Sequence, residues 1–378
     1  MMPFDFSLPE PVGGHDALRV EVRAFLREAL PPGYSPSDRA RSWTGFDAAF
    51  SRALGARGFV GMTLPREYGG QGRSPVERHV VVEELLAAGA PVAAHWIADR
   101  QSAPMILHNG TEEQRRTILP RIAAGACYFC IGMSEPDSGS DLASVRMLAE
   151  RMADGGWRLT GTKLWTTFAH ESHYMICFCR TGPAEDRHGG TSQFLIDLSL
   201  PGIAIRPVLD IAGEHHFNEV SFDRLELPAD ALLGREGQGW AQVMSELSFE
   251  RSGPERFLSS FALLDETLRC APDDTTVRRG IGRLAAHLLV LRHMSHSVAG
   301  RLAAGEKPDL PAAIVKDLGA LFEQEVPERA RELIDPDRAD PEWHRTFARI
   351  RQMAPSFSLR GGTREVLRGI IARGLGLR

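Results

Sequence analysis

Residues 127–141 read CYFCIGMSEPDSGSD and are the most diagnostic part of this chain. Residues 161–167, a little further on, read GTKLWTT. Both segments are rich in hydroxyl groups and follow strand-like apolar runs, so we expect both to be loops at strand ends. Side-chain hydroxyls and backbone N–H groups in such loops can hold a flat polar ring by hydrogen bonds. The two segments together predict a binding site for a planar ligand.

The first of three regions, residues 1–124, has helical periodicity from residue 16 onwards. Thr111 and Gln114 form a capping box, which marks the start of one helix. The apolar side chains of another expected helix recur one turn apart, at Trp43, Phe46, Phe50 and Leu54. This pattern predicts an N-terminal helical domain.

The second region, residues 125–233, has short apolar runs and frequent turns. Residues 154–156, Asp-Gly-Gly, separate two strand-like runs as a hairpin turn would. Further strands are expected at residues 174–179, 193–196, 203–208 and 217–222, which indicates an antiparallel sheet domain.

The third region, residues 234–378, is helical again. Its longest apolar seam, with spacings of three, four and seven residues, predicts an antiparallel helical bundle. The expected fold class is therefore α+β, with a helical N-terminal domain, a middle antiparallel sheet and a C-terminal bundle.

The composition is typical of a globular enzyme, with 25% charged residues and a formal net charge of −5. No basic field indicates nucleic-acid binding, and no apolar run is long enough to span a bilayer. The N-terminus lacks the features of a secretory signal, so we expect a cytoplasmic protein.

Cysteine pairs at 127/130 and 177/179 allow either a zinc or redox site or simple packing of small buried residues. Packing is favoured, because there is no second C-x-x-C. The histidine pairs 170/173 and 215/216 have no supporting carboxylate spacing, and we expect no metal site.

The two loops resemble the flavin-contacting loops of the acyl-CoA dehydrogenase family, which read roughly T/S-E-P-x-x-G-S-D and K-x-W-x-T. Further family motifs are matched in the same order at residues 58–70, 109–120, 217–220, 233–240 and 362–366. The resemblance spans nearly the whole chain. It implies the same three-domain architecture, FAD as the cofactor, and α,β-dehydrogenation of an acyl-CoA thioester.

The resemblance also implies roles for single residues. Ser134 occupies the position of the hydroxyl that contacts the flavin, and Ser140 lies near the pyrophosphate and the acyl-CoA. Trp165 would pack beside the isoalloxazine, and Thr167 would hydrogen-bond near N5. The other expected cofactor-binding residues are Met133, Gly139, Thr363 and Glu365. Loop capping by the serines and core packing by Trp165 are the structural alternatives.

The catalytic base of this family is a glutamate at one of two positions. Most members carry it directly before the C-terminal G-T, where this chain has Gly361. The second position lies on the helix after the sheet domain, where residues 247–251 read LSFER, so Glu250 is the expected base. Glu246 and Glu255 are the fallbacks, and Gly361 is expected to contribute a backbone N–H to the thioester oxygen. Pairing of Glu250 with Arg251 or Arg256 is the structural alternative.

The family's adenine-side motifs, R-x-x-F-G and Q-x-x-G-G, are incomplete here, since residues 270–277 read CAPDDTTV. The expected assembly is a homodimer or homotetramer that passes electrons to an electron-transfer flavoprotein or similar acceptor. Two alternatives stay open: a partner subunit of a heteromeric enzyme, and an acyl-CoA oxidase. The sequence does not identify the acyl chain.

Overall fold

The computed structural model describes residues 6–7, 14–183 and 185–377, without the side chains of residues 246–250. The chain forms two compact units, each assembled from separate parts of the sequence. The first contains Met1–Phe50, Arg73–Ala93 and Ser248–Arg378, and the second contains Ser51–Gly72 and Ala94–Leu247. The expected domain boundaries after residues 124 and 233 stay predictions.

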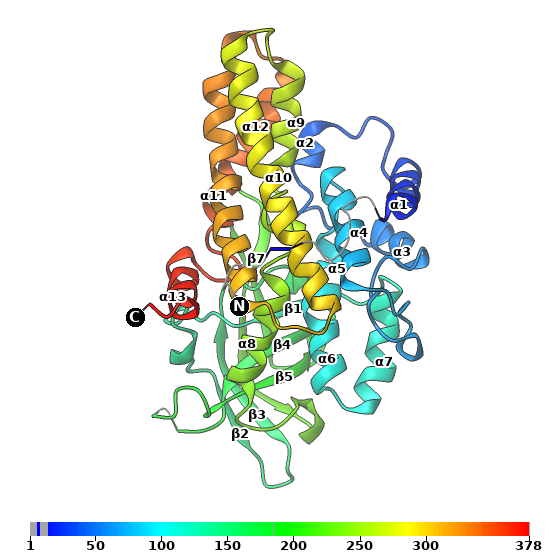
Figure 1. Ribbon diagram of the computed structural model, residues 1–378. Helices are drawn as coiled ribbons and strands as arrows, with labels where there is room; N and C mark the ends of the chain where they lie inside the picture. Colours follow the sequence, from blue (N-terminus) through cyan, green and yellow to red (C-terminus); the bar gives the residue numbers. More distant parts are fainter. Residues whose placement is uncertain (1–5, 8–13, 184, 378) are drawn as a thin grey trace. The chain divides into compact units, whose positions relative to one another are not determined.

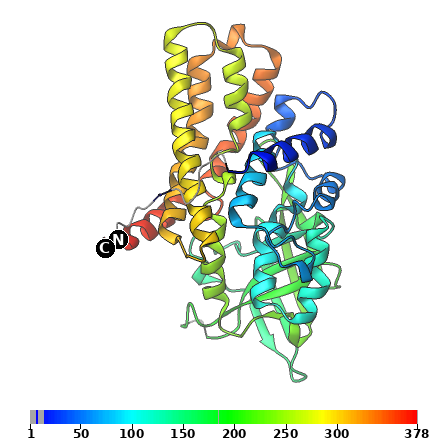
Figure 2. The same ribbon diagram turned by 45° about the vertical axis from the view of Figure 1, so that its right-hand side comes forward.

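The first unit is helical and is dominated by a bundle of four helices that lie side by side (Figure 1, Figure 2). These are α9 (Phe261–Cys270), α10 (Thr275–Ala303), α11 (Asp309–Leu333) and α12 (Pro341–Phe357). The expected seam lies on α10, where Ile281, Leu284, Leu291 and Val298 are buried. The unit's other α-helices are α1 (Asp16–Ala29), α2 (Pro36–Arg39), α4 (Pro75–Ala87) and α13 (Arg364–Gly374).

Helix α4 packs against α1 and α10 with charged side chains in the interface. The buried Glu83 carboxylate accepts from Arg292 Nε on α10 at 2.5 Å and pairs with Arg19 on α1 at 2.6 Å. One turn earlier, His79 Nε2 lies 2.9 Å from the Ser295 hydroxyl of α10. Because a buried charge is tolerated only when paired, these contacts fix how α4 packs on its neighbours.

Helix α3 (Ala48–Ala56) is shorter than the sequence pattern indicates. Phe50 and Leu54 lie on it and are buried, whereas Trp43 and Phe46 precede it, so the expectation of one continuous face was wrong for those two. The reason is Asp47, whose carboxylate accepts from the Phe50 N–H at 2.8 Å and starts the helix after itself.

The helices of the second unit include α5 (Ala93–Ile97), α6 (Ala103–Asn109) and α7 (Glu112–Ala123). A π-helical turn at Ala98–Ser102 joins α5 to α6. The expected capping box is confirmed: Thr111 Oγ1 accepts from Gln114 N at 3.2 Å, and Gln114 Oε1 accepts from Thr111 N at 2.9 Å.

The sheet of this unit has the strand order β6-β7-β3-β2-β4-β5-β8, with β1 paired to β4. Its strands are β1 (Phe129–Gly132), β2 (Leu148–Arg151), β3 (Trp157–Lys163), β4 (Tyr174–Arg180), β5 (Thr191–Asp197), β6 (Ile203–Leu209), β7 (His215–Leu227) and β8 (Leu232–Leu233). The Asp-Gly-Gly hairpin and the four other expected strands are confirmed. Most pairs are antiparallel, but β1 and β2 both run parallel to β4.

Side chains alternate between two apolar cores on the faces of the sheet. On one face, Phe129, Ile176 and Leu195 pack against α6 and α7. On the other, Cys130, Cys177 and Phe194 pack with Trp157 and their neighbours. The strands are therefore held by packing on both faces, and the loops that leave them start from fixed positions. Helix α8 (Gly239–Glu250) follows the sheet.

Candidate functional site

The first expected loop leaves β1 at Gly132 and folds back on itself within a few residues. Glu135 N–H donates to the Ser138 carbonyl at 2.7 Å, and Ser138 N–H donates back at 3.2 Å. The Ser138 hydroxyl, which is buried, donates to the Asp141 carbonyl at 3.0 Å. The capping work of this loop is thus done by Ser138 and its neighbour Ser144, whose hydroxyl also donates to the Asp141 carbonyl at 2.7 Å.

The second loop follows β3 and has an unusual backbone. Trp165 has φ 60° and Phe168 has φ 52°, a region that L-residues rarely adopt. Trp165 is 55% exposed and touches Phe217 edge-on, with ring centroids 5.8 Å apart. It is therefore not a core aromatic, and the structural alternative for this residue fails. Such conformations are costly and persist where surrounding contacts enforce them.

Asn218 on β7 supplies that enforcement. Thr166 N–H donates to the Asn218 carbonyl at 2.9 Å, and Asn218 Nδ2 donates to the Thr166 carbonyl at 3.0 Å. The Asn218 side-chain oxygen also contacts the stacked rings of His170 and His215, whose centroids are 3.8 Å apart. The family motif at residues 217–220 includes Asn218 but gives it no role, and the sequence signal for one is an amide within the strand-like run FNEV.

The two loops are neighbours in space. Leu164 N–H donates to the Ser134 carbonyl at 2.9 Å, which joins the segment that carries Met133 and Ser134 to the segment that carries Trp165 and Thr167. In the described part of the chain, no group hydrogen-bonds to the hydroxyl of Ser134 or Thr167. Thr166 Oγ1 is buried and likewise lacks a partner there.

Gly139 and Ser140 lie at the exposed end of the first loop. A Cβ added to Gly139 would meet no atom within 4 Å, so the backbone is open there. Across the described residues, the Ser140 hydroxyl has no hydrogen-bond partner either. Ser140 does not cap the loop, and its side chain is available to a ligand.

The expected base belongs to the first unit. Glu250 is the last residue of α8, but its side chain, like that of Glu246, lies outside the described part of the structure. The fallback Glu255 is 1% exposed. The next residue after Glu250, Arg251, is buried and donates from Nε to the Gly361 carbonyl at 3.2 Å.

Gly361 and Gly362 form a turn that only glycine adopts without strain, with φ 68° and 95°. Thr363 follows as the N-cap of α13, and its hydroxyl accepts from Val366 N–H at 3.4 Å. Glu365 is exposed in the first turn of the same helix. The sequence-predicted residues therefore fall into two groups, one in each compact unit.

The paired cysteines are free and buried. Burial raises the pKa of Cys127 to about 11 and also raises that of Cys130, so neither forms a thiolate readily. Cys177 and Cys179 lie on one face of β4 with their sulfur atoms 3.7 Å apart. These contacts are those of small core residues, as the packing interpretation predicts.

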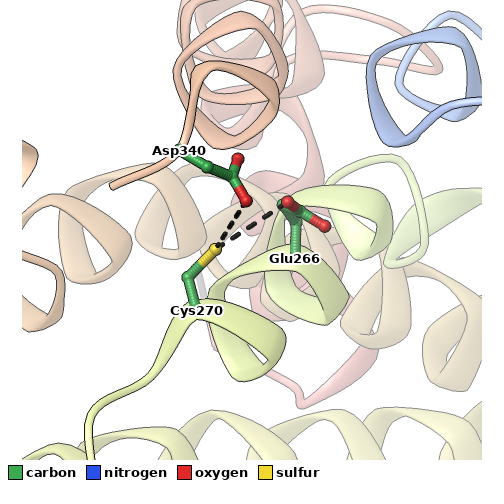
Figure 3. Close-up of side chains that lie close together, drawn as sticks. All are labelled: Glu266, Cys270 and Asp340. Atoms are coloured by element: carbon green, nitrogen blue, oxygen red, sulfur yellow. Dashed lines mark hydrogen bonds between the residues drawn. The ribbon is translucent and has the colours of Figure 1, made fainter. Parts of the chain in front are cut away.

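One group of side chains in the first unit has spacing compatible with a cation: Glu266, Cys270 and Asp340 (Figure 3). The Arg269 guanidinium, however, donates to both carboxylates. Hydrogen bonds from Arg269 are the main cause that lowers the pKa of Asp340. The cluster is thus an ion-pair network in which Arg269 already offsets part of the carboxylate charge.

None of the described helices is long and apolar enough to cross a membrane.

Comparison with known proteins gives matches along most of the chain. Residues 14–126, 130–225 and 237–376 match the N-terminal, middle and C-terminal domains of acyl-CoA dehydrogenases. The acyl-CoA dehydrogenase IpdE1 of Mycobacterium tuberculosis is 32% identical over 96% of this chain and 97% of its own length.

Two solved structures share the fold. The Tcur3481-Tcur3483 steroid ACAD has a TM-score of 0.86 at 26% identity, over 99% of this chain and 100% of that one. The ChsE4-ChsE5 complex from Mycobacterium tuberculosis has a TM-score of 0.84 at 28% identity, over 98% and 100%. This chain therefore belongs to the acyl-CoA dehydrogenase family of flavoprotein oxidoreductases.

Proposed function

We propose that this chain binds FAD through its two loops and removes the α-proton of an acyl-CoA thioester with Glu250. The observation that carries the proposal is the pairing of the loops through Leu164 and Ser134, which gathers unpartnered hydroxyls beside an exposed tryptophan. When bound, FAD supplies at N5 the acceptor for the β-hydride, which a saturated carbon has no other way to release.

The loop residues fit a flavin. The buried Thr166 hydroxyl and the free hydroxyls of Ser134 and Thr167 are suited to the nitrogen and oxygen atoms along the edge of the ring. Trp165, held out of the core by its left-handed backbone, offers an aromatic face. Met133 lies beside Ser134 in the same loop, while Gly139 and Ser140 provide the open backbone and free hydroxyl for the phosphate side.

The C-terminal residues are proposed to act on the same ligands. Gly361 leaves its backbone N–H unshielded by a side chain, which suits a donor to the thioester oxygen as negative charge develops there. Arg251 holds the Gly361 carbonyl, which belongs to the next peptide unit and so fixes the turn that follows this N–H. Thr363 and Glu365 begin α13, and a helix N-terminus favours a nearby phosphate group.

Glu250 is the proposed base because position 361 carries no carboxylate. Proton abstraction requires a carboxylate within hydrogen-bonding reach of the α-carbon, in a site from which water is excluded. In the proposed mechanism, Glu250 takes the α-proton, the Gly361 N–H stabilises the thioester oxygen, and the two loops orient the flavin ring that accepts the hydride.

The substrate class is proposed from the relatives. One structural neighbour is named a steroid ACAD, so we propose a bulky, polycyclic acyl chain. The electrons then pass to an electron-transfer flavoprotein or similar acceptor. An acyl-CoA oxidase would instead reduce dioxygen, and anaerobic reduction followed by exposure to air separates the two, because only the oxidase forms peroxide rapidly.

A second candidate function is that of one subunit in a heteromeric dehydrogenase. Residues 271–274 lack the family's Phe-Gly, and the preceding Arg269 is held by Glu266 and Asp340, which leaves its charge neutralised within the chain. A subunit of this kind does not complete an adenine half-site for a second copy of itself. Purified alone, it would lose its yellow chromophore on gel filtration, whereas a homo-oligomer would keep one FAD per chain.

The test of the proposed base is Glu250→Gln, with Glu246→Gln one turn earlier as the matched control. Each protein is titrated anaerobically with a panel of acyl-CoA thioesters while the flavin absorbance is followed. We expect Glu250→Gln to retain flavin and fail to bleach, and Glu246→Gln to bleach normally. Bleaching by Glu250→Gln at the wild-type rate would assign the base to another residue.

A further inference from the structure

A buried ion pair links the segments that carry the two loops. Lys163 Nζ lies 2.8 Å from Glu135 Oε1, and the two side chains are only 0% and 6% exposed. Lysine and glutamate are rarely so deeply buried. Removing an ion from water costs several kcal/mol unless close partners compensate. The groups around a pair at this depth must therefore include hydrogen-bond partners at fixed positions.

The remaining contacts of the pair are with backbone groups of the same region. Lys163 Nζ also donates to the Met133 carbonyl at 3.1 Å. The Glu135 carboxylate accepts from Arg146 N–H at 2.8 Å and from Met147 N–H at 2.9 Å. The pair therefore ties three segments together: the loop after β1, the approach to β2, and the end of β3.

The sheet itself has other means of support. Strand β3 is paired on both sides, with β2 and β7, and its apolar side chains belong to a large core. The pair lies at the point where β3 ends and the second loop begins. The pair connects the two loops, because Lys163 directly precedes Leu164 of the second loop and donates to the Met133 carbonyl of the first.

We propose that the Lys163–Glu135 pair is a positioning element of the flavin site, which sets the separation between the loop of Met133 and Ser134 and the loop of Trp165 and Thr167. This inference rests on the proposed function. Neither charged side chain touches the ligand; both act through the loops they hold. A flavin contacted from both loops would bind less tightly once their separation is no longer fixed.

The test compares Lys163→Met, Glu135→Gln and the double variant with wild type. For each, FAD affinity is measured by fluorescence titration of the full-length protein, and the unfolding midpoint by urea titration with far-UV circular dichroism. The control is Arg158→Met, a substitution in the same strand at an exposed pair with Glu226. We expect each single variant to bind FAD at least about tenfold more weakly and to be less stable, and the control to change neither.

The double variant separates positioning from general stability. Removing both charges relieves the unpaired ion, so the unfolding midpoint should recover toward wild type. A positioning role predicts that FAD affinity stays low, because the ion pair that fixes the loop separation is still absent. Recovery of FAD affinity in step with stability would overturn the inference. Where the neutral variants fail to fold, Glu135→Asp keeps the charge but shortens the side chain, and unchanged FAD affinity there would also overturn it.

Amide hydrogen exchange provides a readout that needs no flavin. In ligand-free Lys163→Met, the amides of Leu164 and Glu135 should exchange at least about tenfold faster, while those of strand β5 stay protected. If wild type binds no FAD in any assembly, the proposed function fails, yet faster exchange would still show that the pair couples the loops. If wild type binds FAD and the variants match it in affinity and exchange, only the positioning role fails.

Discussion

The stability of the first unit should depend on pH through His79, which is buried on α4 against α10. Burial is the main cause that lowers the pKa of His79 to about 3 from 6.5, with His296, Arg292 and Arg19 adding to it and Glu83 opposing it. The unfolded chain therefore binds the proton more readily than the folded one. Stability is complete above the unfolded pKa and is lost as pH falls from about 6.5 toward 3.

The size of the effect follows from linkage. The full shift between 6.5 and about 3 corresponds to about 5 kcal/mol, of which about 2 kcal/mol is already lost at pH 5. Glu83 contributes little at that pH: burial raises its pKa, but the hydrogen bond from Arg292 and nearby positive charges outweigh burial and lower the pKa to about 2. The window between pH 8 and pH 5 thus isolates histidine.

The measurement is urea unfolding at pH 8 and at pH 5, followed by circular dichroism. His79→Gln keeps a donor for Ser295 but does not titrate, so its loss between the two pH values should be about 2 kcal/mol smaller than that of wild type. His293→Gln, at an exposed position of α10, is the matched control and should behave as wild type. Equal losses for wild type and His79→Gln would refute the reasoning.

Three further predictions concern the candidate site and the cysteines. Trp165→Ala should lower the flavin absorbance retained after gel filtration. It should change the unfolding free energy by less than about 1 kcal/mol, since the side chain is largely exposed. Unchanged flavin retention and kinetics would contradict the flavin contact. Gly361→Ala should destabilise the protein by about 1–2 kcal/mol, measured by urea titration, because position 361 has φ 68°, and should slow flavin reduction; wild-type values for both would remove the turn from the mechanism. Native iodoacetamide labelling, read by mass spectrometry, should modify Cys270 first, because it is only partly buried, and labelling of Cys130 before unfolding would contradict the packed core.

Much of the fold was predictable because its signals are local. The capping box at Thr111 and Gln114, the hairpin after β2 and the apolar seam of α10 each depend on residues close in sequence. The first residue of a helix is harder to predict. Helix α3 begins after Asp47, later than the aromatic spacing suggests, because one side-chain hydrogen bond outweighs the periodicity. The parallel pairing of β1 with β4 depends on residues more than forty positions apart and leaves no local trace.

The candidate site was only partly predictable for the same reason. The loop motifs identify Ser134 and Trp165, but the motif letters do not say that Lys163 and Glu135, one from each motif, pair in the core. Nor do they show that Ser138, between the expected ligand serines, performs the capping. Such contacts form when segments distant in the sequence come together in the fold, and a single sequence does not show which segments do so.

The interleaved order of the two units has a consequence for how the protein is made. Helix α4 is synthesised early, but Arg292, which binds Glu83 of this helix, lies 209 residues later in the chain. At roughly 5–20 residues per second, translation of that interval takes about 10–40 s. During this time Glu83 can pair with Arg19 but not with Arg292, and the face of α4 that packs against α10 is uncovered, so the nascent chain exposes the kind of surface that chaperones shield.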